Sequence, residues 1–331
     1  MPNLQDRVLG ISGKAQALFF RQLATMVQAG MTFLGALETL CNASPGGIQR
    51  WLSEAIPKLR EGAPFSAAFT DYPYLFTPFI GAMVVSAEQS GRVDQVLLSL
   101  ADHVERAWQA RMELMTRLAY PFLMLHAGIV IPPLVTWYMK GLGAYLAVVI
   151  PGFLILYGTL LGGILLYRTT VLKEIRTLVD AMLLFTPVVG RLARLMAAMW
   201  FIRTLAELMD AGLAVPKALE LAAGACGNSI MEQRLLTAIP KVQNGRSLTE
   251  AFTDIDALPY TVVQMLASAE QSGTIPHMLR KSSDLMEIDV RAGLQTVGVA
   301  IPMVVFFIIA GAMGYQIITL YKQVYAPIMN L

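Results

Sequence analysis

Three long stretches without any charged residue constrain this chain more than any other feature of its sequence. They cover about residues 118–139, 144–167 and 296–320, and none contains Asp, Glu, Lys or Arg. A helix needs about 20 apolar residues to cross the hydrocarbon core of a bilayer. The whole chain is only 15% charged, whereas ordinary soluble domains are roughly 25% charged. The sequence therefore predicts a membrane protein with three transmembrane helices.

Basic residues are concentrated in two segments that flank these stretches. Residues 1–117 hold 10 Lys and Arg and residues 168–295 hold 13, while Lys140 and Lys322 are the only others. Cytoplasmic segments next to membrane spans carry an excess of Lys and Arg. We therefore expect the N-terminus and both large segments in the cytoplasm, and a periplasmic tail at 321–331.

The two basic segments are copies of each other. Phe19–Leu40 aligns with Phe201–Ala222 with nine identities in 22 positions, and Ser86–Gly91 reappears unchanged as Ser268–Gly273. Self-similarity at this scale indicates a duplicated structural unit. Two copies can lie on the same side of a membrane only if an extra span returns the chain, and this accounts for the middle stretch.

Each copy has the pattern of a helical bundle. Apolar residues recur at i, i+4, i+7 and i+8 from Phe19, which is typical of one helix face. Expected helix boundaries are glycines that can adopt a left-handed conformation and one capping box: Gly30, Gly91, Gly212, Gly273 and Ser247–Glu250. The predicted fold class is an all-α membrane protein, with helical domains at 1–117 and 168–295 and three transmembrane helices.

Motifs for catalysis, metal binding and nucleic-acid binding are missing from the sequence. It contains no G-x-x-x-x-G-K-[ST], H-E-x-x-H or G-x-S-x-G pattern. The net charge of +2 does not suit a nucleic-acid binder. The only cysteines are Cys41 and Cys226, in segments expected to be cytoplasmic. We expect no enzymatic activity, cofactor or metal. Because Met1–Lys14 has no apolar run, we expect insertion through the internal spans rather than through a cleaved signal peptide.

Charged residues that recur in both copies are candidates for partner binding. Glu88 and Glu270 could bind a partner or a cation, or their carboxylates could support the local helix–turn–helix. Gly91 and Gly273 close the same repeated turn. A second repeated set, Arg21 with Glu38 and Arg203 with Glu220, has the same spacing in both copies and suits an ion pair within each domain.

His126 is the one ionisable residue inside a predicted span. Such residues are candidates for function, and the alternative is a neutral imidazole bonded to a neighbouring helix. The spans also carry glycines suited to close helix packing: Gly158, Gly162, Gly163, Gly311 and Gly314.

The duplicated motifs resemble a known family. The pattern R-x-L-A-x(4)-A-G-x(5)-A-L-E, then G-x(5)-A-F, then E-x-S-G, then a span that begins near a proline, occurs twice within residues 15–320. It is similar to the type II secretion F family, the inner-membrane platform of type II secretion and type IV pilus systems. The short segment before the first copy is more like type IVb or conjugative thin-pilus platforms.

This resemblance implies a protein without catalytic activity. Family members couple a cytoplasmic secretion ATPase to the extraction and assembly of pilins or pseudopilins, contact other inner-membrane assembly proteins, and are expected to self-associate. Two alternatives are a prepilin-processing enzyme and a membrane subunit of a transporter. The spans contain no aspartate, which argues against the peptidase, and their uncharged faces fit a transporter poorly.

Overall fold

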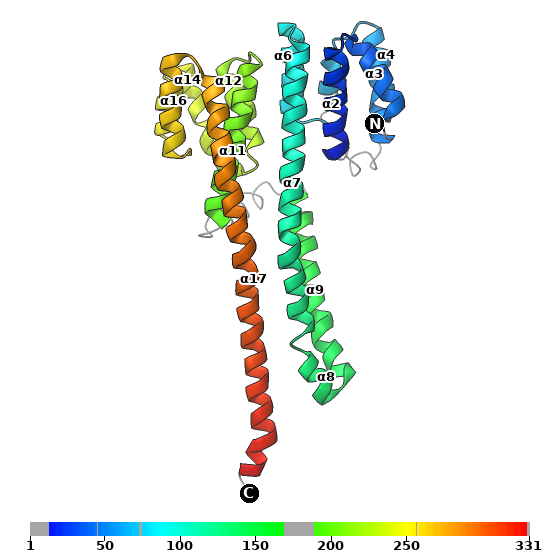
Figure 1. Ribbon diagram of the computed structural model, residues 1–331, viewed down its shortest axis with the longest axis vertical. Helices are drawn as coiled ribbons and strands as arrows, with labels where there is room; N and C mark the ends of the chain where they lie inside the picture. Colours follow the sequence, from blue (N-terminus) through cyan, green and yellow to red (C-terminus); the bar gives the residue numbers. More distant parts are fainter. Residues whose placement is uncertain (1–12, 45, 73–74, 169–188, 256, 330–331) are drawn as a thin grey trace. The chain divides into compact units, whose positions relative to one another are not determined.

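The computed structural model describes residues 13–44, 46–72, 75–168, 189–255 and 257–329. Every regular element in these ranges is a helix (Figure 1), which confirms the all-α expectation. The chain divides into two compact units. The first holds Met1–Met112 with Ala193–Ile288, and the second holds Glu113–Leu192 with Asp289–Leu331.

The first unit contains both repeats, built from matching helices. The first repeat comprises α2 (Gly13–Gln28), α3 (Phe33–Ala43), α4 (Gly46–Arg60), α5 (Ala67–Thr70), α6 (Pro78–Ser90) and the beginning of α7 (Val93–Val130). The second comprises α11 (Val189–Asp210), α12 (Val215–Ala225), α13 (Ser229–Leu236), α14 (Ala238–Gln243), α15 (Leu248–Thr253), α16 (Tyr260–Ser272) and the beginning of α17 (Ile275–Met329). By sequence, α2, α3, α6 and α7 correspond to α11, α12, α16 and α17.

Aromatic side chains fill the core of each repeat. In the first, the rings of Phe19 and Trp51 lie 5.2 Å apart, edge to face. Trp51 Nε1 donates a hydrogen bond to the Ala68 carbonyl at 2.6 Å, so the one polar group of this buried indole is satisfied. In the second, Phe201 and Phe252 lie 5.6 Å apart. In both repeats the first helix, α2 or α11, therefore contributes a phenylalanine to the aromatic core.

The predicted helix boundaries are confirmed. The φ angles of Gly30, Gly91, Gly212 and Gly273 are 88°, 68°, 91° and 70°, in the region that favours glycine. Ser247 Oγ accepts a hydrogen bond from the Glu250 N–H at 3.1 Å, the N-cap interaction of the predicted capping box.

Three helical stretches are long and apolar enough to cross a membrane, within Val93–Lys140, Leu142–Gly163 and Ile275–Thr319. The first predicted span is not one helix, however. Helix α7 ends at Val130, and α8 (Leu134–Lys140) precedes α9 (Leu142–Arg168). The break falls at Pro132 and Pro133, which lack the N–H that a helix interior needs. Helices α7, α9 and α17 nevertheless contain Pro121, Pro151 and Pro302.

Close packing in the second unit uses glycines other than those predicted. A Cβ at Gly128 would lie 3.0 Å from Ile309 Cδ1, and one at Gly152 would lie 2.9 Å from Ile129 Cγ2. Helix α7 therefore approaches α17 at Gly128 and α9 at Gly152. A Cβ at the predicted packing glycines would meet nothing within 4 Å: Gly158, Gly162, Gly163, Gly311 and Gly314.

Candidate functional site

Arg21 on α2 holds the beginning of α7 through two carboxylates. Its Nη2 lies 2.6 Å from Asp102 Oδ1 and 2.6 Å from Glu105 Oε2. The two acids are three residues apart and therefore share one face of α7. The hydrogen bonds to Glu105 and then Asp102 raise the pKa of Arg21 further above its usual range.

The second repeat reproduces this arrangement with greater burial. Arg203 Nη2 lies 2.8 Å from Asp284 Oδ1 and 2.9 Å from Glu287 Oε2 on α17. The Arg203 side chain is 4% exposed, whereas the Arg21 side chain is 42% exposed. We call these two sets the arginine clamps. Each joins the first helix of a repeat to the helix that continues into a candidate span.

The predicted ion pairs between Arg21 and Glu38, and between Arg203 and Glu220, are wrong. Glu38 on α3 instead accepts from Arg60 Nε and Nη2, at 2.9 and 2.8 Å. Arg60 lies at the end of α4, the helix that packs beside α3. Gln243 stands at the corresponding position of the second repeat.

In the second repeat, where a glutamine stands at the position of Arg60, Glu220 pairs with a lysine of its own helix, α12. It accepts a hydrogen bond from Lys217 Nζ at 2.8 Å. Both side chains are more than half exposed, and an ion pair at such a position contributes little to stability.

Glu88 and Glu270 cap the start of a short helix in each repeat. Glu88 Oε1 accepts from the Phe65 N–H at 2.9 Å, and its Oε2 accepts from Ser66 Oγ at 2.6 Å. Glu270 accepts from the N–H groups of Leu248 and Thr249, at 2.6 and 3.2 Å. A carboxylate satisfies free amides and complements the positive end of a helix. These contacts support the structural interpretation of both glutamates.

Gly91 and Gly273 end the helices that carry these two glutamates. Each glycine follows its capping helix, α6 or α16, three residues after the glutamate, and turns the chain with a left-handed φ. In the part of the chain that the structure describes, no group of three or more His, Cys, Asp and Glu is placed to hold a metal ion.

Both ring nitrogens of His126 have a partner within the second unit. Nδ1 lies 2.7 Å from the Phe122 carbonyl oxygen, and Nε2 lies 2.8 Å from the Tyr157 hydroxyl on α9. A carbonyl can only accept, so Nδ1 donates, and the neutral imidazole can then accept from Tyr157 at Nε2. This arrangement fits the neutral histidine bonded to a neighbouring helix.

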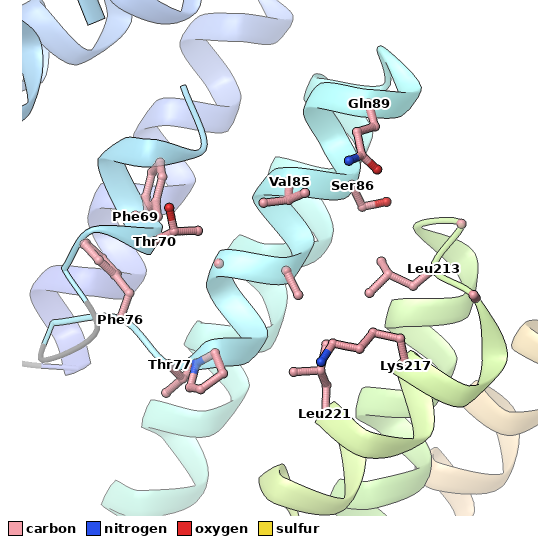
Figure 2. A pocket seen from close by; sticks show the side chains of 15 residues that line it. Phe69, Thr70, Phe76, Thr77, Val85, Ser86, Gln89, Leu213, Lys217 and Leu221 are labelled. Carbon is pink, nitrogen blue, oxygen red and sulfur yellow. The ribbon is translucent and has the colours of Figure 1, made fainter. Parts of the chain in front are cut away.

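The contact between the two repeats was not predicted from the sequence. Ser86 Oγ on α6 donates to the Ala211 carbonyl at 2.5 Å, and His103 Nδ1 on α7 lies 2.5 Å from Glu207 Oε2 on α11. A cavity of about 670 Å³ lies between α6 and α12, and Figure 2 shows Val85 on one side of it and Leu213 on the other. Comparing the two repeats could not predict this contact, because His103 aligns with Leu285 and Glu207 with Thr25.

This architecture defines a class of duplicated, all-helical membrane proteins in which each repeat continues through one long helix into a candidate span. The chain belongs to the family of the type II secretion system (T2SS) protein F, whose model matches residues 19–139 and 201–321. The three candidate spans and this family together indicate a protein of the inner membrane.

Relatives named for type II secretion and for type IV pilus assembly each match more than four-fifths of the chain. Type II secretion system protein F of Pseudomonas aeruginosa is 29% identical, covering 97% of this chain and 84% of the relative. The protein of the same name from Vibrio cholerae is 31% identical, covering 83% and 73%. Type IV pilus assembly protein PilC of Thermus thermophilus is 28% identical, covering 89% and 78%.

Proposed function

We propose that this chain is a non-catalytic assembly platform of the inner membrane, which couples a cytoplasmic secretion ATPase to the extraction and polymerisation of pilins or pseudopilins. The proposal takes its biological setting from relatives named for type II secretion and for type IV pilus assembly. Its proposed partners are that ATPase, the pilin or pseudopilin subunits, and other assembly proteins of the same membrane.

The arginine clamps are the observation that carries the mechanism. Helix α7 contains the two acids of the first clamp and most of the first predicted span, and α17 contains those of the second clamp and the third predicted span. A force on either repeat would therefore pass to a membrane segment along a hydrogen-bonded helix rather than through a loop. Packed rigid elements of this kind can carry coupling between distant sites.

The distribution of basic residues supports a specific orientation. The repeats hold nearly all the Lys and Arg of the chain, so we place the N-terminus and both repeats in the cytoplasm, and the C-terminus in the periplasm. Reporter domains that fold only in the periplasm, fused after Lys140 and after Met329, should be active. The same reporter after Arg60 should be inactive.

A helix-break experiment tests the coupling. Two glycines inserted after Met112 interrupt α7 between its clamp and the predicted span at 118–139. We expect this variant to reach the membrane in normal amount but to support no fibre assembly or secretion, because glycine destabilises a helix interior and uncouples its two ends.

A matched insertion after Gly141, in the turn between α8 and α9, controls for insertion itself. It interrupts no helix and should leave assembly unchanged. Normal assembly with the Met112 insertion would contradict coupling through α7.

A further inference from the structure

The two repeats of one chain contact each other through unlike faces. The first repeat contributes α6 and the beginning of α7, and the second contributes α11 and the turn into α12. Across this contact Ser86 bonds the Ala211 carbonyl, His103 contacts Glu207, and Arg92 Nη2 lies 3.4 Å from the Asp210 carbonyl. A contact between unlike faces of similar units is heterologous, and the same pair of faces can be used again by the next unit.

Because the chain is duplicated, each repeat has a version of both faces. The contact inside the chain uses one version of each face, and the other version of each takes no part in it. A shift of 182 residues relates α2 to α11, and α6 with early α7 to α16 with early α17. The second repeat has its own version of the α6 face on α16 and early α17, which we call the open α16 face: Tyr260, Ala267, Ser268, Leu285 and Ile288. The first repeat has its own version of the α11 face, which we call the open α2 face: Leu18, Thr25, Ala29 and Met31.

Each open face has an apolar side chain that is more exposed than its counterpart inside the chain. Leu285 is 50% exposed, while the side chain of its counterpart His103 is 13% exposed. Leu18 is 56% exposed, and its counterpart Trp200 contacts the His103 ring at a centroid distance of 5.8 Å. The open faces therefore hold apolar groups at the positions that form the contact inside the chain.

The residue differences between the two pairs of faces are mutually consistent. Inside the chain, His103 meets Trp200 and the carboxylate of Glu207. The corresponding open positions would bring Leu285 against Leu18 and Thr25. The open α16 face thus has a leucine at the position of His103, and the open α2 face has a threonine at the position of Glu207. No buried carboxylate would be left without a partner.

The hydrogen bond at the centre of the contact can also be reproduced. Ser86 corresponds to Ser268 within the unchanged Ser-Ala-Glu-Gln-Ser-Gly run, and Ala211 corresponds to Ala29. Ser268 is exposed, whereas Ser86 is 8% exposed. The proposed contact therefore has the Ser268 hydroxyl and the Ala29 backbone carbonyl at the positions that Ser86 and Ala211 occupy inside the chain.

We propose that the open α16 face of one copy binds the open α2 face of a second copy, in the geometry that joins the two repeats inside each chain. Continuity with the existing contact identifies the occupant as another copy of this protein. Heterologous contacts build rings or open chains, so copies joined in this way would form a ring or an open row in one membrane. This self-association goes beyond the proposed coupling and does not require an ATPase or a pilin.

Cross-linking between two tagged chains tests the proposal. In a Cys41→Ser, Cys226→Ala background, one chain carries Met31→Cys and a differently tagged chain carries Ala267→Cys. A short bis-maleimide is applied to membranes that contain both chains. We expect a dimer that carries both tags, and none from either variant expressed alone. The reference is Val85→Cys with Leu213→Cys in one chain. These two residues align with Ala267 and Met31 and line the cavity between the repeats, so this pair should cross-link within the monomer.

Two results would overturn the proposal. One is a reactive reference pair without any dimer between the two tagged chains. The other is a dimer formed by a single variant alone, since that requires like faces to meet.

A charge placed on the open α16 face provides an independent measurement. Leu285→Arg should lower the yield of the mixed dimer about tenfold, because docking would bury an unpaired charge. Ser53→Arg, on the exposed surface of α4, is the matched control and should leave the yield unchanged. Both variants should accumulate in the membrane like the parent. Undiminished cross-linking by the Leu285→Arg variant would contradict the proposed face.

Discussion

His103 and Glu207 form a hydrogen-bonded pair between the two repeats, with 2.5 Å between Nδ1 and Oε2 and side chains only 13% and 11% exposed. The duplication places Leu285 and Thr25 at the corresponding positions. The pair is therefore specific to the contact inside one chain. At this contact the two repeats differ in sequence, and the side chains that meet are complementary in charge and hydrogen bonding.

Removing one member of this pair should cost more than replacing both. His103→Leu leaves the Glu207 carboxylate buried without its partner, and we expect a loss of about 1–3 kcal/mol of stability. His103→Leu combined with Glu207→Thr installs the chemistry of the open faces and should recover most of that loss. Thermal unfolding of the purified protein in detergent measures both variants. The single variant Glu207→Thr completes the comparison. If the stability losses of the two single variants simply add up to that of the double variant, the direct interaction is contradicted.

The two arginine clamps should differ in their contribution to stability. Arg203 is almost fully buried and Arg21 is 42% exposed, so solvent screens the first clamp far more. We expect Arg203→Gln to cost about 2–3 kcal/mol and Arg21→Gln about 1 kcal/mol or less. Melting temperatures of the two variants, compared under the same detergent conditions, give the order. An equal or reversed order would contradict the assignment from burial.

The capping glutamates should behave alike in the two repeats. Glu88→Ala and Glu270→Ala each leave amides at a helix start without their carboxylate acceptor, and we expect each to cost about 1 kcal/mol. Glu88→Gln and Glu270→Gln keep one acceptor oxygen and should cost less. If either alanine variant is fully stable but fails to support assembly, that glutamate binds a partner rather than capping a helix.

Tyr72 should make the protein less stable in alkaline solution. Burial raises the pKa of Tyr72 above its ordinary value, so the folded phenol keeps its proton to higher pH than the unfolded one. The unfolded state then holds fewer protons above about pH 10, the ordinary tyrosine pKa. Stability therefore falls as the pH rises through that value. Tyr72→Phe should show a shallower fall in melting temperature between about pH 9 and 11, and an unchanged slope would contradict the assignment.

Local features of the structure could be predicted from the sequence. Apolar length alone predicted three candidate spans, and Gly91 and Gly273 were predicted as turn positions because few other residues adopt a left-handed φ. The capping role of Ser247 depends on residues within four positions of it. Such features need no knowledge of how distant helices pack.

Features that depend on packing could not be predicted in the same way. Arg21 pairs with acids 81 and 84 residues away, and the repeat spacing of Glu38 did not show that α4 lies beside it. The expected first span at 118–139 overlooked the break at Pro132 and Pro133. The contact of Ser86 with Ala211 joins different repeats, and comparing one repeat with the other cannot reveal a contact between them.

Deletion of the gene in its host tests the central claim most directly. The major pilin or pseudopilin would be followed by immunoblotting, and surface fibres by electron microscopy. The assembly-platform function predicts mature, processed subunits retained in the membrane, no fibres, and recovery of fibres when the intact gene is restored. Unprocessed subunits would instead indicate a processing enzyme, and normal fibres would contradict a role in assembly.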